Sequence, residues 1–338
     1  MSGFGSILRD YLEYYKISQT DFADRLGISQ KHMNEIINGK TSLSTELIMA
    51  ISLLTDIDVN LIYFVENKKR TYDMLIDKYK DEKGIRKILS SYSINEMNEK
   101  GWLKLKDSAN CIQNYLDLIE YIGVKDLDVF EKYLNKRYLF KKSDDSDNKK
   151  IFLWIKHCDN MTKNITINNY DHNKLDLLFK EIKIERNKKL DLDSIIKLFN
   201  KYGIVLYIED ALKGSKVRGC IKVMVDRPVI YLTKYYKEKA SFYFTLYHEL
   251  FHLKKDYNML KNKTIIENDD EYEIDKQALN EMIDDNIYKS ILADFDNKDK
   301  IAKDNLIPLC FLYTRLAKEG IISYNSKEYL NNIERINN

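Results

Sequence analysis

Apolar residues recur at helical spacing through most of the chain and are interleaved with charged ones, a pattern that predicts a mainly helical protein. The first such repeat covers residues 4–15. Three short β-branched runs, at 204–208, 220–225 and 229–232, predict strands instead, the last two pairing around a turn. The pattern therefore predicts a mainly α fold with a small β-sheet in its C-terminal half.

Turn and cap signals near the N-terminus predict two short helices separated by a glycine. Ser18 can cap a helix over Gln19–Leu26, and Gly27 can adopt the left-handed conformation that ends it. Ser29 can then cap a second helix over Gln30–Asn38. Two helices joined at this spacing form the helix-turn-helix arrangement.

The chain is long enough for more than one domain, and its patterns change twice. We predict a helix-turn-helix domain over 1–66, a helical linker or middle region over 67–174, and a third domain over 175–338. The run Lys141–Lys150 contains no apolar residue and is predicted to be a solvated loop. His157 and His172 are isolated histidines, and we leave both out of any metal site.

The strongest chemical signal is His248-Glu249-Leu-Phe-His252, which lies in an apolar-rich segment predicted to be a helix over Phe242–Lys254. Histidines four residues apart share one face of a helix, so both imidazoles can reach one metal ion. Glu249 stands where a carboxylate can act on a water molecule at the metal without being a ligand. The pattern is that of zinc-dependent peptide hydrolases.

A zinc site of this class needs a third protein ligand, which must come from further along the chain. A helix is predicted from Glu271 through Met282, and Glu271 and Asp275 share one of its faces. This spacing fits Glu271 as the ligand and Asp275 as a carboxylate that orients a histidine N–H. Glu273 is the weaker candidate for the ligand, and an acidic solvated helix start is the alternative for the whole cluster.

Composition limits the partners and the cellular compartment that can be expected for this chain. The chain has 55 Lys and Arg against 53 Asp and Glu, so it has no strong global field for nucleic acid or membranes. The four cysteines are scattered without a close pair, which predicts buried, reduced thiols. No signal peptide or apolar run of membrane-spanning length is found, so we expect a cytoplasmic protein that does not bind membranes.

The residues from Ser18 to Gln30 and from Ile36 to Lys40 resemble the Cro/CI-type, or lambda-repressor-like, DNA-binding domain of five helices. The resemblance implies that Gln30–Asn38 is the recognition helix, and Asn, Gln and Lys can read base edges. The expected DNA-contacting residues are Gln30, Lys31, His32, Asn34 and Asn38 for bases, with Gln19 and Lys40 for phosphates. Residues 1–66 hold nine Asp and Glu against five Lys and Arg. DNA binding therefore calls for a dimer or for help from Lys68-Lys-Arg70.

The segments Lys213–Gly219, Val229–Thr233, Phe242–His252 and Glu271–Ala278 together resemble the ImmA/IrrE family of metallopeptidases, with Ile307–Ile322 similar to the end of its long members. The resemblance implies an α+β, zincin-like C-terminal domain joined to a HigA-like helix-turn-helix. It also implies cleavage of a repressor or partner protein in a phage, mobile-element or toxin–antitoxin setting.

The leading hypothesis is a DNA-binding regulator with an appended zinc endopeptidase. Its metal ligands would be His248, His252 and Glu271, its catalytic residue Glu249, its orienting residue Asp275, and its cofactor Zn²⁺. Its partners would be an operator bound as a dimer and a protein substrate such as a repressor or toxin. One alternative is a non-enzymatic regulator or antitoxin whose peptidase-like domain only binds a partner or senses a ligand. Another is an enzyme whose helix-turn-helix only docks the substrate.

Overall fold

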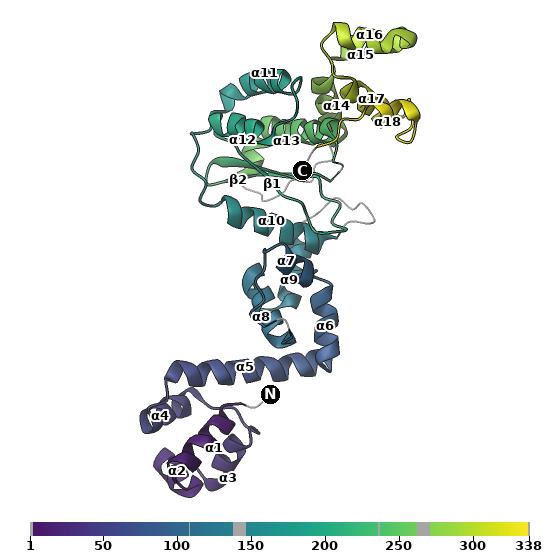
Figure 1. The fold of residues 1–338 in the computed structure, drawn as a ribbon. Helices are drawn as coiled ribbons and strands as arrows, with labels where there is room; N and C mark the ends of the chain where they lie inside the picture. The colour runs from purple at the N-terminus through teal and green to yellow at the C-terminus, as the bar shows by residue number, and fades with distance from the viewer. Residues whose placement is uncertain (1–2, 108, 138–146, 236, 262–270, 337–338) are drawn as a thin grey trace. The chain divides into compact units, whose positions relative to one another are not determined.

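The computed structural model describes residues 3–107, 109–137, 147–235, 237–261 and 271–336 (Figure 1). These residues are mainly helical, with one three-stranded sheet, as the sequence predicted. The chain divides into two compact units, Met1–Tyr121 and Ile122–Asn338, each of which is described by itself. The predicted middle region is thus shared between the two units.

The first unit begins with five helices: α1 (Phe4–Tyr14), α2 (Gln19–Leu26), α3 (Gln30–Ile37), α4 (Thr45–Thr55) and α5 (Val59–Tyr79). The predicted caps between α2 and α3 are confirmed. Ser18 Oγ accepts from the Asp21 N–H, and Ser29 Oγ accepts from the His32 N–H at 3.2 Å. Gly27 has φ of 69°, which lets the chain turn sharply between the two helices. The predicted helix-turn-helix arrangement is therefore present.

The core of these helices is built from the apolar positions of the helical repeat. Buried side chains of α1, α2, α3, α4 and α5 meet in one cluster, in which Ala23 lets α2 approach its neighbours closely. The cluster contains Phe4, Leu8, Leu12, Phe22, Ala23, Met33, Ile36, Ile37, Leu43, Ile48, Ile51 and Ile62. The packing fixes α3 with its polar side facing solvent.

The fifth helix does not stop at the predicted domain end of residue 66 but continues to Tyr79. Buried Glu66 accepts hydrogen bonds from the backbone N–H groups of Phe4 and Leu43 at 3.1 and 3.3 Å. Arg70 donates to the Leu43 carbonyl at 2.6 Å, and Lys69 donates to the Gly39 carbonyl. Two of the three basic residues expected to assist DNA binding are thus engaged in holding the module together.

The rest of the first unit is helical, as predicted for the middle region, with α6 (Glu82–Ser90), α7 (Ile94–Glu99) and α8 (Cys111–Ile122). The second unit begins with α9 (Leu127–Arg137) and α10 (Asn148–Thr162). Residues 141–146 of the predicted loop lie outside the described residues. Its last part is helix, so the prediction is wrong there. Asp147 Oδ1 accepts from the N–H groups of Lys149 and Lys150 and starts α10.

The sheet of the second unit has the order β1-β3-β2. β1 (Val205–Ile208) runs parallel to β3 (Arg227–Leu232), and β2 (Gly219–Met224) runs antiparallel to β3 in the register Gly219↔Leu232. The predicted pairing of the last two strands is confirmed, and β2 is an edge strand. The sheet lies between α13 (Lys239–Leu260) and α10 (Figure 1), which contacts it through a hydrogen bond of 2.7 Å from the Tyr231 hydroxyl to Asp159.

The helices around α13 complete the unit. Before the sheet come η1 (His172–Lys174), α11 (Leu175–Glu185) and α12 (Leu192–Lys201). After α13 come α14 (Glu271–Met282), α15 (Asp285–Ala293), η2 (Phe295–Asn297), α16 (Lys298–Asp304), α17 (Leu309–Lys318) and α18 (Lys327–Asn332). α14 has the bounds that the sequence predicted.

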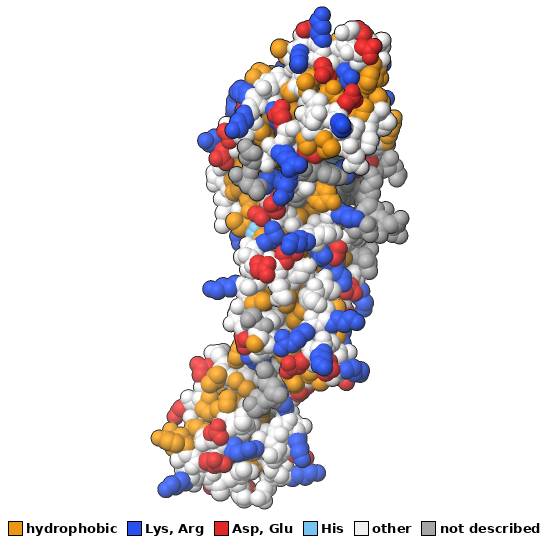
Figure 2. All heavy atoms as spheres, turned by 45° about the vertical axis from the view of Figure 1, so that its right-hand side comes forward, with side chains coloured by type: hydrophobic (Ala, Val, Ile, Leu, Met, Phe, Trp, Pro, Cys, Tyr) orange, Lys and Arg blue, Asp and Glu red, His pale blue; other side chains and the backbone are white. Residues whose placement is uncertain are grey.

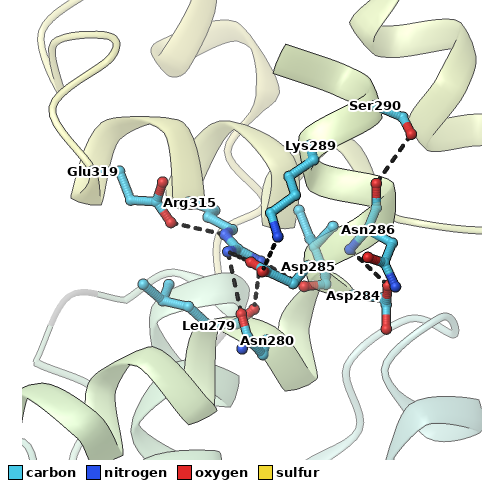
Figure 3. Close-up of polar contacts among 10 residues, drawn as sticks. Leu279, Asn280, Asp284, Asp285, Asn286, Lys289, Ser290, Arg315 and Glu319 are labelled. Carbon is cyan, nitrogen blue, oxygen red and sulfur yellow. Dashed lines mark hydrogen bonds and ion pairs between the residues drawn. The ribbon is translucent and has the colours of Figure 1, made fainter. Parts of the chain in front are cut away.

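Arg315 of α17 ties the end of α14 in place (Figure 3). Its side chain is only 3% exposed and donates to the carbonyls of Leu279 and Ile283 at 3.3 and 2.5 Å. It also bonds Asp285 at 3.2 Å and Glu319 at 2.9 Å. Carbonyls at a helix C-terminus lack helical partners, so a guanidinium is well suited to this position. The contact fixes α17 against the helix that begins at Glu271.

Candidate metal centre and nucleic-acid interface

Helix α13 brings His248 and His252 together. The helix is longer than the predicted Phe242–Lys254, but the i,i+4 geometry is the one expected, and the two Nε2 atoms lie 3.1 Å apart. The helix is apolar on most sides and buried under the sheet, so the histidines are held on a fixed scaffold. Two imidazole nitrogens therefore point to one place.

Glu271, the first residue of α14, reaches the same place from a distant part of the chain. Its Oε2 lies 3.2 Å from His248 Nε2, and its Oε1 lies 3.4 Å from His252 Nε2. One potential ligand atom from each of the three residues lies within 4.8 Å of the others. Glu273 is exposed and is not part of this group. The structure thus gathers the three predicted ligands and leaves the weaker candidate outside.

Carboxylates hold the outer nitrogen of each imidazole. Asp275 Oδ1 lies 2.8 Å from His248 Nδ1, the position predicted for an orienting carboxylate. Asp256 Oδ2 lies 3.4 Å from His252 Nδ1, and only 6% of Asp256 is exposed. Our sequence reasoning missed Asp256, although its place four residues after His252 was a usable signal. Such partners fix the ring orientation of metal-binding histidines.

The electrostatics of the cluster favour a cation. Burial lowers the pKa of His248, but hydrogen bonds to Asp275 and Glu271 and the charge of Glu249 outweigh it and raise the pKa to about 10. For Glu271 the effects are reversed. Burial raises the pKa of its carboxyl group, but hydrogen bonds with both histidines outweigh burial and hold that pKa well below its usual range. The carboxylates thus stabilise positive charge at this point. Two imidazoles and a carboxylate are a donor set that zinc prefers, so these residues fit the ion.

Glu249 lies beside the ligands, on the side that faces the sheet. Its side chain is 7% exposed, and burial raises its pKa. A Cβ atom added at Gly219 would lie 2.7 Å from Glu249 Oε1 and 2.9 Å from Thr245 Cγ2. The start of β2 therefore passes directly over the carboxylate, and any side chain larger than that of glycine would have to displace it. A carboxyl group with a raised pKa, held next to a cluster that could hold a metal ion, is suited to proton transfer.

We predict that Gly219→Ala disturbs Glu249 without removing the ligands. The added methyl group must displace the Glu249 carboxylate or the strand, and in the zinc endopeptidase expected from the sequence a misplacement of about 1 Å would lower the cleavage rate by about 100-fold. Zinc content should stay close to that of the unaltered chain, because no ligand is changed. Cleavage rate, zinc content and melting temperature would be measured together. An unchanged cleavage rate would show that Glu249 has room that the structure does not give it.

The candidate nucleic-acid interface is the exposed side of α3. Gln30, Lys31 and Asn34 are exposed, and His32 is half-buried. Gln30 Nε2 donates to the Thr20 hydroxyl at 3.1 Å, which couples α2 to α3. Asn38 follows the end of α3, one residue beyond the observed helix, and its Nδ2 donates to Asn34 Oδ1 at 2.6 Å. Gln30, Asn34 and Asn38 follow one another at four-residue spacing, so these predicted base-contacting residues share one side of the helix, whereas the half-buried His32 is two residues from Gln30 and faces another way.

The predicted phosphate contacts, Gln19 and Lys40, are also exposed. Gln19 is the first residue of α2, and Lys40 follows Asn38 in the turn after α3, so both belong to the helix-turn-helix module. Across the face shown in Figure 2, Lys and Arg side chains are interspersed with Asp and Glu rather than gathered by sign. Any phosphate contact would therefore depend on individual cations, and Lys40 is the one predicted from the sequence.

His157, His172 and the cysteines lie outside the candidate metal centre. His157 Nε2 is 3.9 Å from Glu209, and His172 stacks on Tyr257 at 5.5 Å between ring centroids. The four cysteines are buried as predicted, and burial raises the pKa of the Cys310 thiol to about 12. Among the described helices, we find none that is both long and apolar enough to cross a membrane.

Comparison with known proteins assigns the N-terminal module. Residues 8–62 match a helix-turn-helix family. The chain is also 29% identical over 62 residues to the ImmF control region 10 kDa protein of Bacillus phage phi105, covering 18% of this chain and 69% of that protein. No solved structure matches the chain significantly. The protein is therefore a regulator with an N-terminal DNA-binding helix-turn-helix domain.

Proposed function

We propose that this regulator carries a zinc-dependent endopeptidase in its second unit and cleaves a repressor or another partner protein. One observation supports the proposal above all others. His248, His252 and Glu271 converge from two helices, carboxylates hold the outer nitrogens of the two imidazoles, and Glu249 lies beside them. A domain that only binds a partner has no need of a buried acid in this position. The resemblance of its segments to the ImmA/IrrE family supports the same activity.

In the proposed peptide cleavage, the metal ion and the side chains of the protein would have separate roles. Zinc, when held by His248, His252 and Glu271, would supply Lewis-acid polarisation of the scissile carbonyl. Glu249 would take a proton from the attacking water and return it to the leaving amine. Burial, which raises the pKa of Glu249, makes its carboxylate a stronger base than an exposed one. Asp275 and Asp256 would keep the two imidazoles in orientation during the reaction.

The sheet offers a way to hold the substrate. β2 is an edge strand, and its first residue, Gly219, lies against Glu249. An extended peptide can add to such an edge through backbone hydrogen bonds, which hold many sequences in one geometry. A substrate strand paired there would run past Glu249. The arrangement therefore favours an extended segment of a protein as the substrate.

Cleavage would be tested with the full chain, first stripped with EDTA and then supplied with zinc. A mixture-based peptide library and the products of neighbouring genes would serve as substrates, with new N-termini identified by mass spectrometry. We expect cleavage that requires zinc and stops on renewed chelation. A chain that holds one equivalent of zinc and cleaves neither substrate set would contradict the proposal and favour a partner-binding regulator.

DNA binding would be measured separately, by the salt dependence of affinity for a labelled duplex of mixed sequence. Lys40→Ala should weaken binding at low salt and reduce the slope of log affinity against log salt by about 1, because one phosphate contact is lost. Lys83→Ala is the matched control, since Lys83 is exposed on α6 outside the helix-turn-helix. Equal slopes for the two variants would rule out the phosphate contact at Lys40.

A further inference from the structure

The second unit contains a cavity that has no part in the function proposed above. Its volume is about 610 Å³, within the range of about 300–1,000 Å³ that is typical of sites for small molecules. It is lined by residues 189–193 at the start of α12, by residues 334–336 after α18, and by Lys239, the first residue of α13. Three separate segments of the chain therefore enclose one space.

Hydrogen bonds hold these three segments together. The Lys239 N–H donates to the Glu334 carbonyl at 2.8 Å, and the Ile336 N–H donates to the Lys237 carbonyl at 2.9 Å. The Lys239 ammonium donates to the Lys188 carbonyl at 2.9 Å, which fixes the segment that leads into α12. The walls of the cavity are thus positioned by the fold, as those of a binding site must be.

A buried cation forms part of these walls. Lys239 is only 4% exposed, and its ammonium bonds the Glu334 carboxylate at 2.8 Å in addition to the Lys188 carbonyl. An ammonium group carries three N–H donors. Among the described residues, these two groups are the only acceptors that bond to it. One N–H of a buried cation is therefore available to a ligand in the cavity.

Three carboxylates also line the cavity, and two of them are already engaged within the protein. Glu334 is bonded to Lys239. Asp191 accepts from the Ser194 hydroxyl at 2.6 Å and from the Asp193 N–H at 3.1 Å, which caps α12. The third, Asp193, is exposed in the first turn of α12, where the helix dipole stabilises a negative charge.

Two further cations line the cavity, and neither is engaged in this way. Lys189 and Arg335 are exposed, and across the described ranges of the chain their side chains make no hydrogen bond or ion pair. Against them stands the single carboxylate of Asp193. The available charge in the cavity is therefore positive, and a guanidinium presents its N–H groups in a planar fork that matches a carboxylate or a phosphate.

The remaining lining residues are apolar. Leu190 and Leu192 are half-buried, and Ile336 is buried. Sites for small organic molecules typically combine such apolar walls with a few polar groups that fix the orientation of the ligand. The cavity thus offers a surface for the body of a ligand as well as cations for its charged group.

We propose that this cavity binds a small organic anion. Its carboxylate or phosphate would bond to Arg335 and Lys189 and accept the remaining N–H of Lys239, while its apolar part would lie against the leucines. The site is separate from the metal centre, because Lys239 precedes His248 by nine residues of α13, a rise of about 14 Å. Binding there does not require that the chain cleave peptides.

Isothermal titration calorimetry of the full chain tests the site. The chain would be stripped of metal with EDTA and dialysed, so that no probe can bind to a metal ion. The organic anions are hexanoate and phenyl phosphate, and hexanol and phenol are their neutral counterparts. Acetate and inorganic phosphate carry the same charged groups without the apolar body.

We expect hexanoate or phenyl phosphate to bind about tenfold more tightly than its neutral counterpart, and more tightly than acetate or inorganic phosphate. The anion that binds identifies the charged group that the site accepts. Arg335→Gln should weaken its binding about tenfold. Asp193→Asn removes the opposing charge and should tighten binding, a change that damage to the fold would not produce. Lys303→Gln, at an exposed lysine of α16, is the control and should leave the affinity unchanged.

Several outcomes would overturn the site. One is the absence of saturable binding of both organic anions at millimolar concentration. Another is equal affinity for an anion and its neutral counterpart, or for an organic anion and the small ion that lacks its apolar body. Anion binding that is unchanged by Arg335→Gln or weakened by Asp193→Asn would place the ligand elsewhere. Melting temperatures of all variants would show that each is folded.

Discussion

Replacement of Glu249 by Gln is expected to abolish peptide cleavage while zinc stays bound. Gln has nearly the shape of Glu, so it fits the buried space under Gly219, but its amide cannot accept and return a proton. Loss of a general base lowers rates by about 10²–10⁴-fold. The three proposed ligands are unchanged, so the metal content should not fall.

The measurement compares zinc content by mass spectrometry with the rate of library cleavage for the same preparations. Glu273→Gln is a matched control, because Glu273 is an exposed carboxylate of α14 outside the ligand group. It should change neither quantity. Normal cleavage by the Glu249→Gln chain would show that another group transfers the proton and that the mechanism is wrong.

Replacement of His252 by Ala is expected to remove zinc altogether. Only two protein ligands would remain, and the position of Glu271 would lose one of its two histidine contacts. Loss of a group that merely orients a ligand costs about 10–100-fold in metal affinity, so loss of a ligand should exceed about 100-fold. Zinc content after dialysis should fall from about one equivalent to nearly none.

His172→Ala provides the comparison. His172 is exposed and stacks on Tyr257, away from the ligand group, so its removal should leave the zinc content unchanged. Retention of a full equivalent of zinc by His252→Ala would place the metal elsewhere. Cleavage should fall in parallel with zinc, which separates this variant from Glu249→Gln, where only cleavage is lost.

Local signals predicted much of the fold because they act within a few residues. The caps at Ser18 and Ser29 and the left-handed Gly27 each depend on contacts inside one turn of chain. The bounds of α2 and α14 follow from such signals. Local rules failed at the segment up to Lys150, where the absence of apolar residues hid the capping role of Asp147. The domain end predicted at residue 66 also falls inside a helix, because α5 continues to Tyr79.

In the candidate site, too, some features could be predicted from local sequence and others could not. The spacing of His248 and His252 on a helix, and of Glu271 and Asp275 on another, was readable because i,i+4 positions always share a face. The same rule could have found Asp256, which follows His252 by four residues. Gly219 over Glu249 and Lys318 over Phe244 could not be found in this way. Each joins segments far apart in sequence, and no periodicity relates them.

The sequence by itself determined the helix-turn-helix, the paired strands and the residues able to bind a metal. These depend on backbone propensity, capping and helical repeat, which neighbouring residues decide. Only the tertiary structure decided that Glu271 meets both histidines, that an edge strand covers Glu249, and that Lys318 lies over the Phe244 ring. Such meetings result from the packing of the whole core, in which α13, the sheet and α17 must fit together at once.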